Sequence, residues 1–145
     1  MFTSFRNAAA MVVCSLFASE YSYAQSTHDI WNHHIQAWTA RSADGIVADY
    51  SDDSVLVVNN QTYPGIGEIR NAFTQLFKIF DNGQNRIDTP TIFDRIVYIT
   101  WHFTPNEKLE QYGTDTFVIE KGKIVFQTIA SPLYDLYPIA HAPIN

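Results

Sequence analysis

Cysteine is almost absent from this chain of 145 residues. Its only cysteine, Cys14, lies in an N-terminal segment that we expect to be removed. The mature chain would then have no disulfide, no thiol nucleophile and no thiolate metal site. Its stability must therefore come from the packing of a hydrophobic core.

Positive charge is also scarce. Lys and Arg number 9 against 15 Asp and Glu, which gives a formal net charge of −6, and the basic residues form no cluster. This balance argues against nucleic acids and anionic membrane surfaces as partners. Outside the N-terminus, no stretch approaches the roughly 20 apolar residues that a membrane span needs. With 46% hydrophobic and 17% charged residues, the composition is typical of one packed globular domain.

The first 24 residues have the pattern of a signal peptide. Arg6 precedes an apolar run from Ala8 to Ala18, and Ser22 and Ala24 supply small residues for cleavage. We expect cleavage near Ala24, a mature chain beginning at Gln25, and a secreted or periplasmic location. The alternative is an apolar N-terminal helix that stays attached.

Apolar periodicity predicts three helices. The first begins at Ser26 or Thr27, the second runs from Ser42 to Tyr50, and the third ends before the turn at residues 81–83. The first helix carries an apolar stripe that includes a histidine: Ile30, Trp31, His34, Ile35 and Trp38. The third carries a stripe rich in phenylalanine: Ile66, Ile69, Phe73, Leu76, Phe77 and Phe80.

The rest of the chain is typical of an antiparallel sheet. β-Branched or alternating segments bounded by turn residues predict strands over 55–58, 61–63, 85–93, 96–104, 110–120 and 123–130. The prolines in residues 132–145 argue against a further helix, so we treat this segment as a C-terminal tail. We expect Leu133 to Tyr137 to fold back over a pocket mouth or onto a partner subunit.

Two short motifs and the order of elements resemble the nuclear transport factor 2-like superfamily, and within it the SnoaL-like and ketosteroid-isomerase-like branches. The motifs are Tyr50-Ser51-Asp52-Asp53-Ser54 before the first strand and Gly65-Ile66-Gly67-Glu68-Ile69 at the start of the third helix. The resemblance covers residues 27–131 and implies a domain over 25–131. The implied fold is α+β, a cone-shaped, curved antiparallel sheet wrapped around helices in the manner of a cystatin-like roll.

The resemblance also implies candidate site residues. Aligned with ketosteroid isomerases, His34 stands at the position of a tyrosine, Val58 at that of the aspartate base, and Asp115 at that of a late-strand acid. Valine cannot act as a base, so the steroid-isomerase mechanism is not supported. SnoaL-like cyclases, which rely on a late-strand aspartate, resemble this arrangement better.

The chemistry of Asp115 agrees with an acid/base role. On a strand it shares a face with Gly113, Phe117 and Ile119, and burial among apolar groups raises the pKa of a carboxyl. The alternative is that Asp115 faces solvent or pairs with Arg95 or Lys123.

His34 is the second catalytic candidate, because histidine exchanges protons near neutral pH. The alternative is a core histidine bonded to a backbone carbonyl. His33 points about 100° away around the helix, so the two histidines are a poor chelating pair and we predict no metal. His102 alternates with Trp101 and is expected on the outer or dimer-facing surface.

We expect an apolar ligand to contact residues of the same apolar faces: Trp31, Trp38, Tyr50, Val58, Phe73, Phe77, Trp101 and Phe117. Three functions stay open. The first is an exported domain that binds an apolar small molecule in an enclosed pocket. The second is a cofactor-free isomerase, polyketide cyclase or dehydratase that uses Asp115 with His34. The third is a homodimerisation module. Asn60-Gln61-Thr62 is a glycosylation sequon, meaningful only in a source that glycosylates exported proteins.

Overall fold

A computed structural model describes residues 25–106 and 109–143 of the chain. The expected signal peptide, residues 1–24, lies outside the described residues. Within the described part, no helix is long and apolar enough to cross a bilayer.

The first two helices begin at the residues that their capping signals indicate. Helix α1 spans Thr27–Thr39, and Ser26 caps it in a reciprocal capping box with Asp29. Helix α2 spans Ala43–Ala48, and the Ser42 hydroxyl accepts a hydrogen bond from the amide of Gly45. Helix α3 spans Gly65–Phe80 and buries the phenylalanine-rich stripe.

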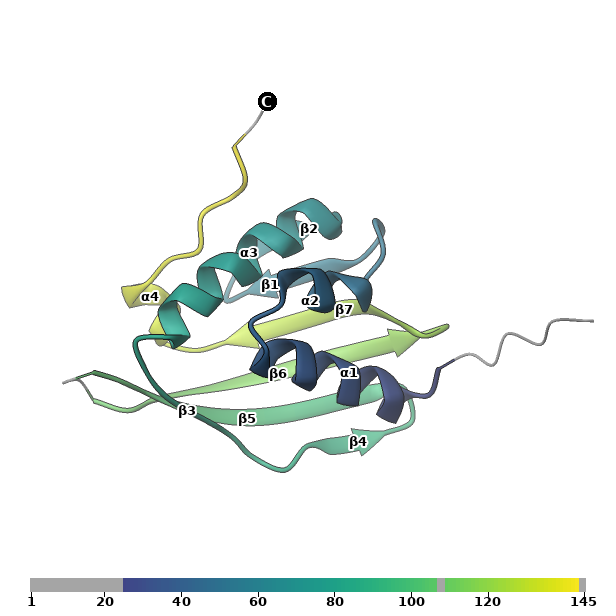
Figure 1. Cartoon of the computed structure of the whole chain (residues 1–145), viewed down its shortest axis with the longest axis horizontal. Helices are drawn as coiled ribbons and strands as arrows, with labels where there is room; N and C mark the ends of the chain where they lie inside the picture. Colours follow the sequence, from purple (N-terminus) through teal and green to yellow (C-terminus); the bar gives the residue numbers. More distant parts are fainter. Residues whose placement is uncertain (1–24, 107–108, 144–145) are drawn as a thin grey trace, which may run out of the picture.

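Seven strands of the described residues form one sheet. They are β1 (Val55–Val58), β2 (Gln61–Pro64), β3 (Gly83–Ile87), β4 (Thr91–Phe93), β5 (Ile96–Pro105), β6 (Gln111–Glu120) and β7 (Lys123–Ala130). The strand order is β2-β1-β7-β6-β5-β3, and β4 pairs with β5 beside β3. Figure 1 shows α1, α2 and α3 on one face of this curved sheet, so the fold is α+β as the sequence predicts.

The sheet differs from the prediction at two places. Strand β1 pairs with β7 in parallel, whereas the other pairings are antiparallel. No hairpin joins β1 to β7, so the turn geometry that forces antiparallel pairing does not act on them. The strand predicted over 85–93 is broken into β3 and β4 around Pro90, which has no amide hydrogen for a ladder.

The prediction that no helix follows residue 131 is wrong. Helix α4 spans Leu133–Leu136, directly after Pro132. Proline removes an amide that the start of a helix leaves unpaired anyway, so it is tolerated there. Beyond α4 the tail runs beside α3 (Figure 1): the Tyr63 hydroxyl donates to the carbonyl of Ile139 at 2.6 Å, and Gln75 donates to that of Ala140 at 2.8 Å.

Candidate functional site

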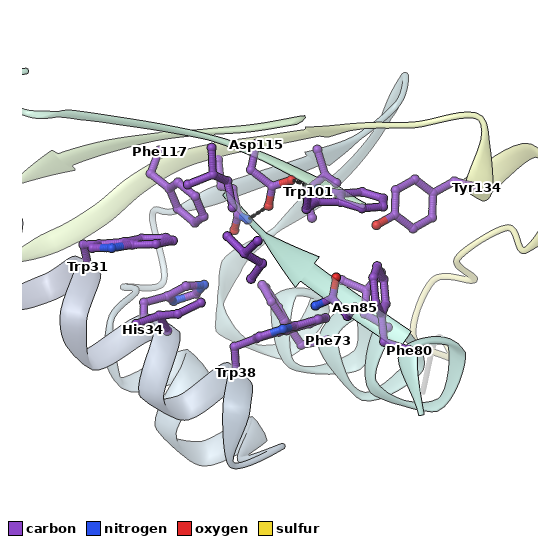
Figure 2. Close-up of a pocket in the computed structure, with 16 residues that line it drawn as sticks. Trp31, His34, Trp38, Phe73, Phe80, Asn85, Trp101, Asp115, Phe117 and Tyr134 are labelled. Atoms are coloured by element: carbon purple, nitrogen blue, oxygen red, sulfur yellow. Dashed lines mark hydrogen bonds between the residues drawn. The ribbon is translucent and has the colours of Figure 1, made fainter. Parts of the chain in front are cut away.

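A cavity lies between α1, α3, α4 and the concave face of the sheet. Its volume is about 40 Å³, room for a few water molecules. All three tryptophans of the chain, Trp31, Trp38 and Trp101, line it. Asp115 and His34 both line this cavity, Asp115 from the sheet and His34 from α1, and Figure 2 shows both side chains pointing into it.

Asp115 is held by two donors from neighbouring strands. The indole Nε1 of Trp101 donates to Oδ1 at 2.8 Å, and the amide Nε2 of Gln127 donates to Oδ2 at 2.9 Å. Trp101 pairs with Gly113 on one side of Asp115, and Gln127 pairs with Phe117 on the other. Both donors are therefore diagonal neighbours of Asp115 on the same face of the sheet.

Gly113 makes the contact between Trp101 and Asp115 possible. The indole of Trp101 lies across the backbone of β6, where a Cβ on residue 113 would come within 2.0 Å of a ring carbon. No side chain larger than hydrogen fits there without moving the ring. The small residue thus lets the indole reach Asp115 two residues further along the strand.

The network continues from Asp115 to a buried tyrosine. The amide oxygen of Gln127 accepts a short hydrogen bond from the hydroxyl of Tyr50. Burial, followed by the nearby carboxyls of Asp115 and Asp49, raises the pKa of Tyr50 well above its usual value. Tyr50 therefore stays protonated and donates to the amide oxygen of Gln127, and the amide NH₂ of Gln127 in turn donates to Asp115.

Burial raises the pKa of Asp115 from 3.8 to about 7, although the hydrogen bonds from Trp101 and Gln127 act in the opposite direction. The carboxyl pairs with neither Arg95 nor Lys123, since Arg95 pairs with Glu120 and Lys123 donates to the carbonyl of Ala48. In its hydrogen bonds with the described residues, Asp115 is always the acceptor and never the donor. A proton on this carboxyl is therefore available to a molecule in the cavity.

His34 is packed edge-on against aromatic rings. Its ring centroid lies 5.2 Å from that of Phe117, 5.7 Å from that of Phe73 and 5.8 Å from that of Tyr50. Its Nδ1 lies 3.3 Å from Oδ2 of Asp49, a buried carboxylate that sequence reasoning missed. The alternative, a hydrogen bond from His34 to a backbone carbonyl, is not seen among the described residues.

An open groove adjoins the cavity. It measures about 400 Å³ and includes Thr39, Arg41 and Gly83 in its lining. Five residues line both spaces and lie between them: Ile35, Trp38, Phe80, Asn85 and Ile87. Asn85 adds a polar group there, because its buried Oδ1 has no hydrogen-bond partner and Figure 2 shows its amide directed into the cavity.

The tail contributes Tyr134 to the cavity lining. Figure 2 shows its hydroxyl pointing inward beside Trp101. Burial and the carboxyl of Asp115 raise the pKa of this tyrosine well above its usual value, so it too stays protonated. Sequence reasoning expected this segment over a pocket mouth or on a partner subunit and did not identify Tyr134 as a site residue.

The predicted ligand-contacting residues divide into two groups. Five line the cavity: Trp31, Trp38, Phe73, Trp101 and Phe117. Tyr50, Val58 and Phe77 are buried in the surrounding core and are not part of the lining. Tyr50 nevertheless acts on the site through Gln127, and Val58 pairs with the lining residue Ile129.

Two further histidine predictions concern metal binding and the outer surface. Among residues 25–106 and 109–143, no three His, Cys, Asp or Glu side chains are grouped so that they could hold a metal ion. His102 is partly exposed and lies beside Asp88 and Glu110, away from the cavity.

Comparison with known proteins identifies a family. A model of the SnoaL-like domain matches residues 31–127. No curated protein sequence matches the chain.

Solved structures with the same fold include a putative SnoaL-like polyketide cyclase from Jannaschia sp. CCS1, with 13% identity, a TM-score of 0.64, and coverage of 81% of this chain and 93% of that one. A steroid delta-isomerase from Pseudomonas aeruginosa has 15% identity and a TM-score of 0.64, with 72% and 78% coverage. An uncharacterised cystatin-fold protein from Novosphingobium aromaticivorans has 16% identity and a TM-score of 0.62, with 72% and 97% coverage. At these identities the likeness concerns the fold.

Proposed function

The chain belongs to the SnoaL-like domain family, and from this premise we propose that it is an exported protein that binds an apolar, ring-containing small molecule in the cavity beneath α1. The observation that carries the proposal is the lining itself, in which three tryptophans share one cavity with a protonatable carboxyl. Sites for small molecules combine such apolar walls with a few convergent polar groups.

The size of the cavity determines how a ligand would enter. Ligand sites usually measure about 300–1,000 Å³, far more than the 40 Å³ enclosed here. The adjoining groove has about 400 Å³. We propose that a ligand occupies the groove and extends its ring inward as Trp38 and Phe80 move apart.

Tryptophan fluorescence tests this proposal, because every tryptophan of the chain contacts the cavity. Titration with an aromatic ketone, acetophenone, is expected to change the emission and to shift the NMR signal of the Trp101 indole N–H. Ile129→Phe fills the cavity and should abolish the response. Thr128 is the neighbour of Ile129 in β7, and its side chain points to the opposite face of the sheet. Thr128→Val should therefore leave the fluorescence and NMR responses unchanged.

If acetophenone perturbs the wild type and the Ile129→Phe variant equally, the ligand binds elsewhere and the proposed site is wrong. A wild type that does not respond at all contradicts the proposal for aromatic ketones. Export rests on the pattern of residues 1–24, and N-terminal sequencing of protein from its own host should begin at Gln25.

A cofactor-free acid/base enzyme is the second candidate, and the pKa of Asp115 favours it. A carboxyl with a pKa of about 7 can give a proton and take it back at neutral pH. Turnover of a ligand identified by screening should fall about 100-fold or more in Asp115→Asn. Unchanged turnover in that variant would show that Asp115 is not the acid/base group.

We also propose that the chain forms a homodimer through the outer face of the sheet. Five apolar residues lie in register across β4, β5, β6, β7 and β1: Phe93, Ile96, Val118, Phe126 and Val55. We call this set the apolar row. No helix of the described residues covers the face to which it belongs (Figure 1), and Phe93 is 77% exposed.

A further inference from the structure

A buried carboxylate lies behind the cavity, at the end of α2. Asp49 is the C-cap residue of this helix, and its side chain is only 4% exposed. Its backbone carbonyl accepts a hydrogen bond from the amide of Ile124 at 2.7 Å, which ties it to β7. No Lys or Arg of the described residues pairs with the carboxylate, whose partners are two histidines of α1.

The two histidines approach different oxygens of Asp49. Nδ1 of His33, a half-exposed residue, forms a 2.6 Å hydrogen bond with Oδ1. Nδ1 of the buried His34 lies 3.3 Å from Oδ2. Neither Nδ1 of His34 nor Oδ2 of Asp49 has another hydrogen-bond partner among the described residues, and the two atoms lie within 3.3 Å of each other.

This juxtaposition determines where His34 holds its proton. A neutral imidazole carries one proton, on either Nδ1 or Nε2. If Nδ1 were bare, its lone pair would face a carboxylate oxygen in a buried space, leaving two acceptors without a donor. A proton on Nδ1 removes this conflict and leaves Nε2 as an acceptor.

Nε2 has no hydrogen-bond partner among the described residues, and Figure 2 shows the ring of His34 pointing into the cavity. We propose that Asp49 is a positioning residue that keeps the proton of His34 on Nδ1, so that Nε2 is presented to the cavity as a proton acceptor. The rings of Tyr50, Phe73 and Phe117 fix the plane of the imidazole.

The proposal names the class of ligand that fits, and in this respect it rests on the proposed function. The cavity then contains a donor, the protonated Asp115, and an acceptor, Nε2 of His34. A compound that carries a carbonyl on one side of an apolar ring and a hydroxyl on the other satisfies both groups. A pure hydrocarbon would leave both of them unpaired, which costs binding free energy.

A purely structural role for Asp49 is the competing explanation, since its contact with His33 joins α2 to α1. Asp49→Asn separates the two roles. The amide oxygen of asparagine can still accept the hydrogen bond from His33. Its NH₂ group would then face Nδ1 of His34, which must become an acceptor, and the proton would move to Nε2.

Long-range ¹H–¹⁵N correlation NMR of histidine-labelled, ligand-free protein reads the tautomer of His34 directly. His34→Gln identifies the signal by its loss. We expect a protonated Nδ1 and a bare Nε2 in the wild type, and the reverse in Asp49→Asn. The matched control is Asp44→Asn, which changes an exposed aspartate of the same helix and should leave the tautomer as in the wild type.

A wild-type His34 with its proton on Nε2 overturns the proposal, and so does an Asp49→Asn variant that folds with the wild-type tautomer. If Asp49→Asn does not fold, the wild-type tautomer still decides the question. His33→Gln is a second test. It removes the histidine that contacts Oδ1 but keeps the carboxylate beside His34, so the tautomer of His34 should not change.

The ligand class is tested with 4-hydroxyacetophenone and acetophenone. One added buried hydrogen bond should make the wild type bind the hydroxylated probe roughly 3- to 10-fold more tightly. Asp49→Asn should reduce this preference and keep its affinity for acetophenone, because the phenolic oxygen accepts a hydrogen bond from Nε2–H more weakly than the phenolic O–H donates one to a bare Nε2. If the preference is undiminished in a variant whose tautomer has changed, Nε2 does not recognise the hydroxyl. If neither probe binds the wild type, the proposed function fails while the tautomer result stands.

Discussion

At the scale of single residues, the burial of Asp115 makes stability depend on pH. The pKa of its carboxyl is about 7 in the folded protein and 3.8 for the free side chain. Between these values the unfolded chain has released the proton and the folded chain still holds it. The contribution to stability is therefore complete below pH 3.8 and is lost as the pH rises to about 7.

We expect the free energy of unfolding of the wild type to fall by about 3 kcal/mol between pH 5 and pH 8 through this group. Asp115→Asn has no proton to lose and should not show this decrease. Urea unfolding at the two pH values measures it, with Asp44→Asn as the control that keeps the wild-type dependence. Parallel pH dependences of the wild type and Asp115→Asn would contradict the buried, protonated carboxyl.

Sequence reasoning reached Asp115 and His34 through the family resemblance, and the pattern of each segment agrees with it. Strand alternation puts Asp115 on the face of Phe117 and Ile119, and helical spacing puts His34 in the apolar stripe of α1. Asp49 gave no such signal. It follows a helix, a position typical of an exposed aspartate, and only the packing of α1 and β7 against α2 buries it.

Gln127 was missed for a different physical reason. In β7 a simple alternation that starts from the buried Ile124 would bury Phe126 and expose Gln127. The register shifts at Val118 and Ile119 of the neighbouring strand, so β7 carries an extra residue after Ile124. After a bulge of this kind, each side chain points to the face opposite to the one that simple alternation predicts. Gln127 therefore points inward to Asp115, and Phe126 points outward.

At the scale of elements, α4 and the tail close one end of the cavity. Leu133 is completely buried, Tyr134 lines the cavity, and Ile139 is buried with its carbonyl bonded to Tyr63 of β2. The sequence predicted that this segment folds back over a pocket mouth or onto a partner subunit, but the prolines concealed its short helix. A single turn makes too few periodic contacts to be recognised by spacing.

Truncation after Ser131 should therefore lower the free energy of unfolding by about 4 kcal/mol or more, because three large apolar side chains leave the core. Truncation after Tyr137 keeps α4 and should cost about 2 kcal/mol, mainly from Ile139. Chemical denaturation of both variants and the full chain provides the comparison. A chain ending at Ser131 that is as stable as the full chain would show that the tail does not belong to the core.

At the scale of the whole molecule, the two faces of the sheet have different roles. The concave face is covered by helices and contains the cavity, as the order of elements predicted from the sequence. The outer face carries the apolar row, and the bulge in β7 places Phe126 there. Simple alternation would have hidden this ring in the core, so the continuity of the row could not be predicted from the sequence.

A continuous apolar row on an uncovered sheet face favours association with a second copy, because pairing removes its surface from water. We expect the protein to be a dimer in sedimentation velocity, with a melting temperature that rises with protein concentration. Phe126→Glu places a charge between Val118 and Val55 of the row and should give a monomer with a concentration-independent melting temperature. Leu136→Glu changes an even more exposed apolar residue on α4, away from this face, and should remain dimeric. A wild type that is monomeric at every concentration, or a dimer that both substitutions leave intact, would show that the apolar row is not the interface.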